Sequence, residues 1–339
     1  MNPHIQLCCG ERFSELELLT HVDEVKHMTA SVGSSGEAVS KSKVVRLEAA
    51  QSRSLWAEAL LHIRRDRLTL LAIFMLVMLT LACVFLPPLI EQALGVSATR
   101  TNVADRYRPP GFGNYILGTD NLGRDQFTRL LYGGRVSLGV AYGASVMSIT
   151  IGVVVGMLAG YYRGLIDDLV NWFITTLSSI PTIFLLILVS VIFSPTPEVL
   201  IILLGLLGWI TTCRLVRGEV LGLKERDFVV AAHSLGAPTH RIMLQHILPN
   251  VISLVIVTLT IDAGSLILIE SGLSFLGLGV RPPTPSWGNM LTDARTYLAT
   301  GQHLIIWPGI MIFATVLCFF LVGDGLRDAF DPRKVRSAK

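Results

Sequence analysis

Two carboxylates lie inside one apolar segment, and their chemistry is the first feature of this chain that needs an explanation. Asp262 and Glu270 both fall within Val251–Leu273, a run long and apolar enough to cross a membrane. Because a charged side chain is costly there, it usually faces a bundle interior or water. Each could line a polar route or make a polar contact to a neighbouring helix. Asp262 is the sharper candidate for a polar route, whereas Glu270 could instead be solvated at the outer interface.

A second polar group precedes an earlier apolar run. It combines two glycines, two aspartates and an arginine: Gly118, Asp120, Gly123, Arg124 and Asp125. Glycine and aspartate favour tight turns, and the opposite charges can pair. We therefore expect a polar turn outside the membrane. It either closes its own loop, which is the preferred interpretation, or forms an outer gate or a contact surface for another protein.

A polar segment between two apolar runs, FVVAAHSLGAPTHRIMLQHILPN (residues 228–250), has the pattern of two short helices. Ala231 and Ala232 lie in the first, which Gly236 is expected to end because glycine is common after a helix C-terminus. Proline suits a first helical turn, so the second helix can begin at Pro238, and Pro249 is expected to stop it. The small residues would let a partner approach the backbone; an ordinary amphipathic connector is the alternative.

No other pattern in the sequence indicates catalysis or metal binding. His233, His240 and His246 lack the spacing of a helical ligand pair, and the five cysteines show no zinc or disulfide spacing. The motifs GxxxxGK[ST], HExxH and GxSxG are missing from the sequence. We therefore expect no catalytic residue, no metal site, and no hydrolysis of ATP or peptide bonds by this chain.

The composition is that of a membrane protein. Of 339 residues, 51% are hydrophobic and 16% are charged, against about a quarter charged in soluble domains, and the mean hydropathy is +0.58. The net charge of +3 gives no indication of nucleic acid binding, and basic residues beside apolar runs suit lipid headgroups. The sequence predicts an all-α polytopic membrane protein in contact with the bilayer and with no nucleic acid.

Six apolar spans are expected within a membrane domain of residues 68–323. The spans are residues 68–90, 136–162, 169–193, 199–213, 251–273 and 304–322. The third is expected to bend at Pro181. The remaining segments are a polar, disordered tail over 1–53, an interfacial helix over 54–67, a loop over 214–250 and a polar tail over 324–339.

Basic residues near the span ends predict the orientation. They precede the first span, fill the loop between the fourth and fifth, and follow the sixth. An even number of spans puts all three groups on the cytoplasmic side. The arginine-rich loop 91–135 lies outside in this topology, because long loops cross membranes largely regardless of charge.

Small residues recur every four positions in the second span. They are Ala144, Ser148, Gly152, Gly156, Gly160 and Gly164. This spacing puts them on one helical face, where small side chains let membrane helices approach closely. Helix packing is therefore preferred over the alternative, a pore-lining face.

The pattern Ala231-Ala232, Gly236, Ile247-x-Pro249 is similar to the "EAA" loop of ABC-importer permeases. Three further segments resemble the second ("C") type of dipeptide, oligopeptide and nickel permeases: residues 118–140, 270–291 and 322–333. The resemblance covers about residues 55–335 with its motifs in the right order. Val230 departs from the family, which often has glutamate before the two alanines, so one polar contact is absent while the docking geometry is kept.

This resemblance implies a type I ABC-importer permease with six transmembrane helices and a cytoplasmic coupling-helix loop. Two ATPase subunits, which hold ATP and Mg²⁺, would dock on Ala231, Ala232, Gly236, Ile247 and Pro249. A second, homologous permease subunit would complete the path, and an extracytoplasmic binding protein would deliver the substrate. The chain itself would bind no cofactor and would lie in a bacterial or archaeal inner membrane with both termini cytoplasmic.

Di- and oligopeptides are the cargo that the resemblance favours, and Asp262 could then engage the amino terminus of a peptide. Nickel, glutathione and other small solutes are alternatives, because selectivity in similar systems lies largely in the binding protein. A secondary transporter would need an inverted repeat or a convincing set of coupling carboxylates, and the sequence contains neither. A membrane enzyme would need catalytic residues, which are missing from the sequence as well.

Overall fold

The computed structural model describes residues 55–193, 195–295 and 301–330. By its contacts the chain divides into two units, residues 1–58 and 59–339, and the contacts described below all belong to the second. The tail expected over residues 1–53 lies outside the described residues, as do residues 331–339 of the expected C-terminal tail.

The regular elements of the described segments are helices, which confirms the all-α fold class. The long ones are α3 (Arg67–Leu94), α4 (Gln126–Tyr162), α7 (Pro197–Leu223), α10 (Leu248–Phe275) and α12 (His303–Phe330). Those of intermediate length are α2 (Leu55–Arg65), α5 (Gly164–Ser178), α6 (Thr182–Phe193), α8 (Asp227–Ser234) and α11 (Trp287–Arg295). Three short pieces complete the set: a 3₁₀ turn η1 (Val103–Asp105), α9 (Thr239–Arg241) and a π-helical stretch η2 (Ile242–Ile247).

Five helical segments in the described residues are long and apolar enough to cross a membrane: α3, α4, α7, Thr239–Phe275 and α12. Helices α5 and α6 also pass this test together, as a pair bent by 78°. The bend falls at Pro181, which has no N–H to donate and disfavours helix at the residue before it. With the bent pair taken as one span, the chain is a multi-pass membrane protein with six spans.

Three helices run past the ends predicted for their spans. Helix α4 begins at Gln126 rather than near residue 136, and α12 continues to Phe330, into the tail expected over 324–339. Helix α7 continues past residue 213 to Leu223, so the expected loop 214–250 begins as helix. The polar part of α7 stays helical because Val216 and Val220 are buried and because Arg217 pairs with Asp167 of α5.

The small residues of α4 pack against α7, as the preferred interpretation of their spacing had it. A Cβ atom added to Gly156 would lie 2.7 Å from the carbonyl oxygen of Cys213, and one added to Gly160 would lie 2.9 Å from that of Arg217. Neither position can hold a larger residue without moving a backbone, so this face is a helix contact and not a pore lining. Gly164 does not belong to it, because it follows the end of α4 with a φ of +59°.

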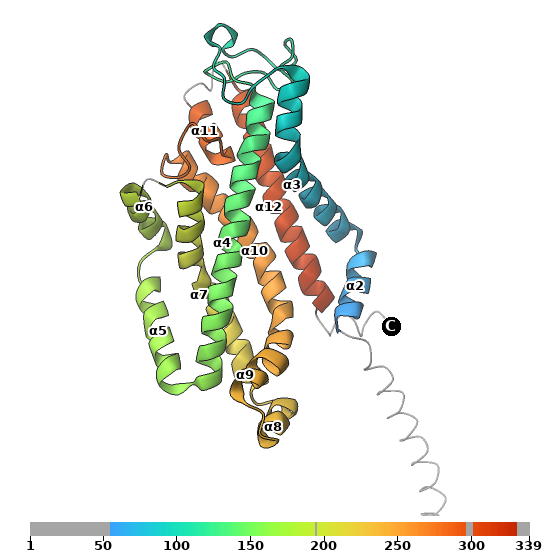
Figure 1. Cartoon of the computed structure of the whole chain (residues 1–339), viewed down its shortest axis with the longest axis vertical. Coiled ribbons are helices and arrows are strands. Elements are labelled where there is room, and N and C mark those ends of the chain that lie inside the picture. The colour runs from blue at the N-terminus through green and yellow to red at the C-terminus, as the bar shows by residue number, and fades with distance from the viewer. Residues whose placement is uncertain (1–54, 194, 296–300, 331–339) are drawn as a thin grey trace, which may run out of the picture. The chain divides into compact units, whose positions relative to one another are not determined.

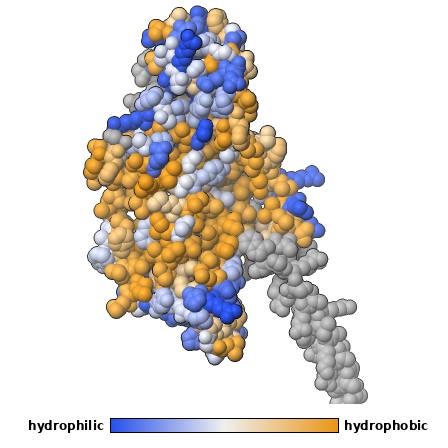
Figure 2. All heavy atoms as spheres, in the orientation of Figure 1, coloured by the Kyte–Doolittle hydropathy of each residue, from blue (hydrophilic) through white to orange (hydrophobic). Residues whose placement is uncertain are grey.

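The second unit has two polar ends with an apolar region between them (Figures 1 and 2). At one end, the loop between α3 and α4 lies against the start of α12, where His303 Nε2 is 3.4 Å from the carbonyl oxygen of Thr119. Helices α8 and α9 lie at the opposite end (Figure 1). The start of α3 and the end of α12 are also side by side, with Gly325 packed against Thr69.

Candidate functional site

Helix α8 ends in a turn that only a residue with a positive φ can make. Gly236 has a φ of +80°, a conformation that costs side-chain-bearing residues about 1–2 kcal/mol. Its N–H donates to the carbonyl of His233 at 3.0 Å, and the next N–H, of Ala237, donates to the carbonyl of Ala232 at 3.1 Å. This pair of bonds is the Schellman arrangement that closes a helix C-terminus. Gly236 therefore sets the direction in which the chain leaves α8.

An apolar cluster holds α8 against the ends of three long helices. Val229 of α8 is buried together with Ile242 and Ile247 of η2, Val220 of α7 and Met157 of α4. Through η2, this cluster connects α8 to α4, α7 and the start of α10. A displacement of α8 is therefore transmitted to the ends of the spans, because a packed cluster resists deformation.

One face of α8 remains exposed although it is apolar. Its members are Phe228, Ala231 and Leu235, here called the α8 face, which follow each other at i, i+3 and i+7, and Leu235 is 89% exposed. The polar end of a membrane protein has no lipid tails to cover such side chains. The α8 face is therefore suited to contact with another protein.

The structure corrects the second half of the predicted module. Helix α9 continues through η2 into α10, so there is no separate second helix that Pro249 stops. Pro249 lies in the first turn of α10, and the π-helical turns before it carry the chain past a residue that has no N–H. Ile247 is fully buried. Of the five residues predicted to contact a partner, Ala231, Gly236 and Pro249 are exposed, Ala232 is half-buried, and Ile247 supports the module from inside.

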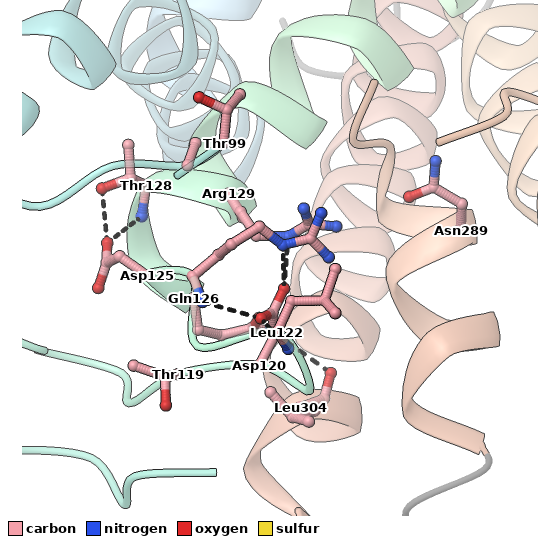
Figure 3. A network of polar contacts seen from close by, with 12 residues as sticks. Thr99, Thr119, Asp120, Leu122, Asp125, Gln126, Thr128, Arg129, Asn289 and Leu304 are labelled. Atoms are coloured by element: carbon pink, nitrogen blue, oxygen red, sulfur yellow. Dashed lines mark hydrogen bonds and ion pairs between the residues drawn. The ribbon is translucent and has the colours of Figure 1, made fainter. Parts of the chain in front are cut away.

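The polar turn predicted around Asp120 is an internal cluster and not a contact surface. Asp120 accepts hydrogen bonds from the backbone N–H groups of Leu122 at 2.8 Å and Arg124 at 2.9 Å. Its other oxygen lies 2.7 Å from Nε of Arg124 and 3.3 Å from Nε of Arg129, as Figure 3 shows in part. Asp120 and both arginines are buried. The cluster therefore closes the loop, which was the preferred interpretation.

Asp125 and two glycines complete this closure. Asp125 caps α4 by accepting hydrogen bonds from the backbone N–H of Thr128 at 2.7 Å and from its hydroxyl at 2.5 Å (Figure 3). Burial raises the pKa of Asp125, although the hydrogen bonds from Thr128 act in the opposite direction. Gly118 and Gly123 both have positive φ, and an added Cβ would collide with the backbone of Arg108 or Asn102.

Glu270 is enclosed by hydroxyl groups rather than solvated or placed on a route. It is fully buried and accepts hydrogen bonds from Ser137 at 2.9 Å, Ser274 at 2.8 Å and Ser271 at 3.4 Å. Ser137 belongs to α4 and also accepts the backbone N–H of Trp287, the first residue of α11, at 3.2 Å. Glu270 therefore joins α4, α10 and α11. Its burial contradicts two predictions, a path-lining group and a residue at a wet outer interface, whereas the third, a polar contact between helices, is confirmed.

Asp262 is in a different position on the same helix. Its side chain is half-buried, and within the described part of the chain it accepts one hydrogen bond, from the hydroxyl of Thr212 on α7, at a long 3.4 Å. A carboxylate can accept about four hydrogen bonds, so Asp262 keeps most of its capacity. Asp262 therefore makes the predicted contact with a neighbouring helix. Its unused acceptor capacity also leaves it able to line a polar route, which stays a prediction.

Sequence reasoning missed the residues that surround Glu270. Ser137, Ser274 and Trp287 come from three helices, and no short motif contains them all. Trp287 is fully buried, and its indole N–H donates to the carbonyl of Leu130 at 2.9 Å. The sequence contains only a local signal for this site. Ser274 follows Glu270 by four residues, which places both on one face of a helix, and Ser271 is the next residue after Glu270.

Comparison with known proteins gives these surfaces a context. Residues 152–336 match the family described as binding-protein-dependent transport system inner membrane component. The oligopeptide transport system permease protein OppC of Haemophilus influenzae is 37% identical over 287 residues, which are 84% of this chain and 90% of that protein. The dipeptide transport system permease protein DppC of Bacillus subtilis is 36% identical over 283 residues, or 83% of this chain and 87% of that protein.

A third relative is named for a different cargo. The glutathione transport system permease protein GsiD of Pectobacterium atrosepticum is 39% identical over 229 residues, which are 68% of this chain and 76% of that protein. Together these matches confirm the resemblance to ABC-importer permeases of the second, peptide-transport type. The chain is a member of the family of inner membrane components of binding-protein-dependent transport systems.

Proposed function

We propose that this chain forms half of the transmembrane path of an ATP-driven importer of di- or oligopeptides. The similar permeases named above serve oligopeptide, dipeptide and glutathione transport, and glutathione is itself a small peptide. A second, homologous permease subunit supplies the other half of the path. The alternative is the same machinery with nickel, glutathione or another small solute as cargo.

The observation that carries this proposal is the α8 face, apolar and exposed at a polar end, on a helix that η2 and the apolar cluster link to the spans. Two ATPase subunits, one for each permease, hold ATP and Mg²⁺ and receive this face in a groove. The chain itself binds no cofactor and catalyses no reaction. When the ATPases close on ATP, they bind one position of α8 better than the other, and this difference drives the spans between inward- and outward-open states.

The charges and the contacts support one orientation in a bacterial or archaeal inner membrane. The α8 end is cytoplasmic and carries basic residues at Arg214, Arg226 and Arg241. The start of α3 and the end of α12 lie together, which supports our proposal that both termini share one side of the membrane, the cytoplasmic one. The loop between α3 and α4 then faces outward, where an extracytoplasmic binding protein delivers the cargo.

A matched pair of arginine substitutions tests the docking. Ala231 is exposed on the α8 face, so Ala231→Arg adds a large charge there without disturbing the buried cluster, whereas the half-buried Ala232 packs against that cluster. Co-purification of the ATPase with the Ala231→Arg chain should fall by more than about tenfold, as expected for an unpaired charge in an interface. The control is Ala104→Arg, the same change at an exposed residue of the outer loop.

The outcomes of this experiment separate the proposal from its rivals. ATPase recovery at the normal level with Ala231→Arg would contradict docking on the α8 face. Uptake of peptide that persists after the ATPase genes are deleted would indicate a secondary transporter. Turnover of a peptide by the purified chain alone would indicate a membrane enzyme.

A further inference from the structure

Asp262 lies at the middle of α10, on a polar stripe that runs along one face of the helix. Thr258, Asp262 and Ser265 follow each other at i, i+4 and i+7, a spacing that keeps side chains on one side of a helix. The middle of a spanning helix is the most costly place in a membrane for a carboxylate. A group retained there in an otherwise apolar helix is a candidate for function.

The hydrogen bonds of this stripe leave it with acceptors and no free hydroxyl donor. Thr258 donates its hydroxyl proton to the carbonyl of Leu254 at 2.8 Å, and Ser265 donates to the carbonyl of Ile261 at 3.0 Å. The hydroxyl proton of Thr212 is directed to Asp262 itself. Lone pairs on the carboxylate and the two hydroxyl oxygens therefore remain for a ligand that only donates.

The nearest arginines along α7 are already engaged elsewhere. Arg217 forms a two-bond contact with Asp167 of α5, with its Nη2 at 2.7 Å, and Arg214 donates to the hydroxyl of Ser178 at 3.0 Å. No ion pair of the described residues includes Asp262. The stripe therefore keeps a negative charge that a cationic ligand can neutralise.

We propose that Asp262, with Ser265 one turn away, binds the protonated amino group of the cargo at the middle of the membrane. A primary ammonium group has three donors and no acceptor, so it suits the carboxylate oxygens of Asp262 together with the lone pairs of Ser265, three residues further along the helix. This assignment rests on the proposed function, in which the chain lines a path for peptides. It identifies the free amino terminus, or a lysine side chain, as the part of the peptide that this subunit recognises.

Uptake by the complete transporter provides the first test. With alanyl-alanine as the probe, Asp262→Asn should lower the uptake rate by about tenfold or more, the effect of losing a hydrogen bond to a charged group. Asp262→Glu keeps the charge and should restore uptake to within about threefold of wild type. Assembly of the complex and its basal ATPase rate should stay at the wild-type level in both variants.

Thr212→Val is the matched structural control, because it removes the hydrogen-bond donor that Asp262 has among the described residues and leaves the charge in place. A role in binding cargo predicts nearly normal uptake for Thr212→Val. If Asp262 served only as a contact between α7 and α10, Thr212→Val and Asp262→Asn would lose uptake and assembly together, and the proposal would be overturned. Wild-type uptake by Asp262→Asn would overturn it as well.

A second test does not depend on the identity of the cargo. In the assembled transporter with its native cysteines replaced, Ser265→Cys should react with cationic 2-aminoethyl methanethiosulfonate faster than with the anionic 2-sulfonatoethyl reagent. Adding Asp262→Asn should reduce this preference by about tenfold, because the attraction of the nearby charge is lost. A cysteine that reacts with neither reagent would show that the stripe is closed to water and would refute the site.

The two tests can fail separately. If wild-type complex does not import alanyl-alanine but the cysteine keeps its preference for the cationic reagent, the peptide assignment is wrong and the cation site stands. If wild type imports the peptide and the preference is absent, the permease function stands and the role of Asp262 is refuted.

Discussion

Glu270 and Asp262 are two carboxylates about two turns apart on α10, and their surroundings differ in almost every respect. Glu270 is fully buried and accepts hydrogen bonds from three serines on two helices. Asp262 is half-buried and accepts one long bond from Thr212. The first is provided with partners by the fold itself, whereas the second has acceptor capacity that the fold leaves unused.

The difference shows how to separate structural from functional polar groups inside a membrane domain. A buried group with all its bonds made within the chain stabilises the fold and is costly to remove. A carboxylate of the same helix that makes few hydrogen bonds contributes little to stability, so its presence in a spanning segment needs another explanation. The same contrast holds between the two polar ends of the molecule. Asp120 in the loop between α3 and α4 is buried among its own partners, whereas the α8 face is exposed.

The largest effect on stability should follow the loss of Glu270. Glu270→Leu removes the acceptor of Ser137 and Ser274 and leaves buried hydroxyl groups unpaired, which should cost about 3 kcal/mol. Glu270→Gln keeps a polar group of the same shape and should cost about 1 kcal/mol. The measurement is the midpoint of thermal unfolding in detergent, and an unchanged midpoint for the leucine variant would remove the structural half of the comparison.

A smaller loss is expected for Gly123→Ala in the outer loop. Gly123 has a φ of +73°, and an added Cβ would collide with the backbone of Asn102, so the change should cost about 2 kcal/mol. Gly113→Ala is the matched control, with a φ of +58° and nothing within 4 Å, and should cost about 1 kcal/mol. Limited proteolysis of the loop measures the difference, and equal sensitivity of the two variants would contradict the tight closure around Asp120.

Replacing Gly236 should affect conformation more than packing. Nothing lies within 4 Å of a Cβ added there, but its φ is +80°, so Gly236→Ala should destabilise the turn by about 1 kcal/mol. Gly236→Asn should be tolerated better, because asparagine accepts this conformation at helix ends. The readout is ATPase activity stimulated by cargo and binding protein. A loss in the asparagine variant equal to that in the alanine variant would show that a partner needs the open space itself.

The smallest effect on stability is expected at Asp262. Asp262→Asn loses one long hydrogen bond and also removes an uncompensated charge. The free energy of unfolding, followed by the unfolding midpoint, should therefore change by less than about 0.5 kcal/mol. Its effect should appear in transport alone. A midpoint lowered as far as that of Glu270→Leu would show that the two carboxylates contribute equally to the stability of the fold.

The sequence was sufficient for the fold class and the glycine turn after α8, and its six spans agree with the structure when the bent pair of α5 and α6 is counted as one span. Apolar runs predict spanning helices well because the bilayer leaves the backbone few alternatives. The ends of α4, α7 and α12 could not be predicted in the same way. Each continues as helix through polar residues, such as Arg217 on α7, whose pairing partner Asp167 is distant in sequence.

The site could be predicted only in part, for a similar reason. Ala231 and Gly236 carry a local pattern, and their exposure and conformation follow from it. Ile247 belongs to the same pattern but is buried, because η2 continues into α10 instead of ending at Pro249. The partners of Glu270 come from α4 and α10 together, a meeting that depends on tertiary packing and leaves no spacing to recognise.

The most direct test of the account compares the two carboxylates in one experiment. Asp262→Asn and Glu270→Leu are introduced separately into the complete transporter, and the alanyl-alanine uptake rate per assembled complex is measured alongside the unfolding midpoint. The account predicts that Asp262→Asn keeps the wild-type midpoint and loses about tenfold or more of its uptake, whereas Glu270→Leu lowers the midpoint and the amount of complex. Wild-type uptake by Asp262→Asn, or a midpoint that falls equally in both variants, would contradict it.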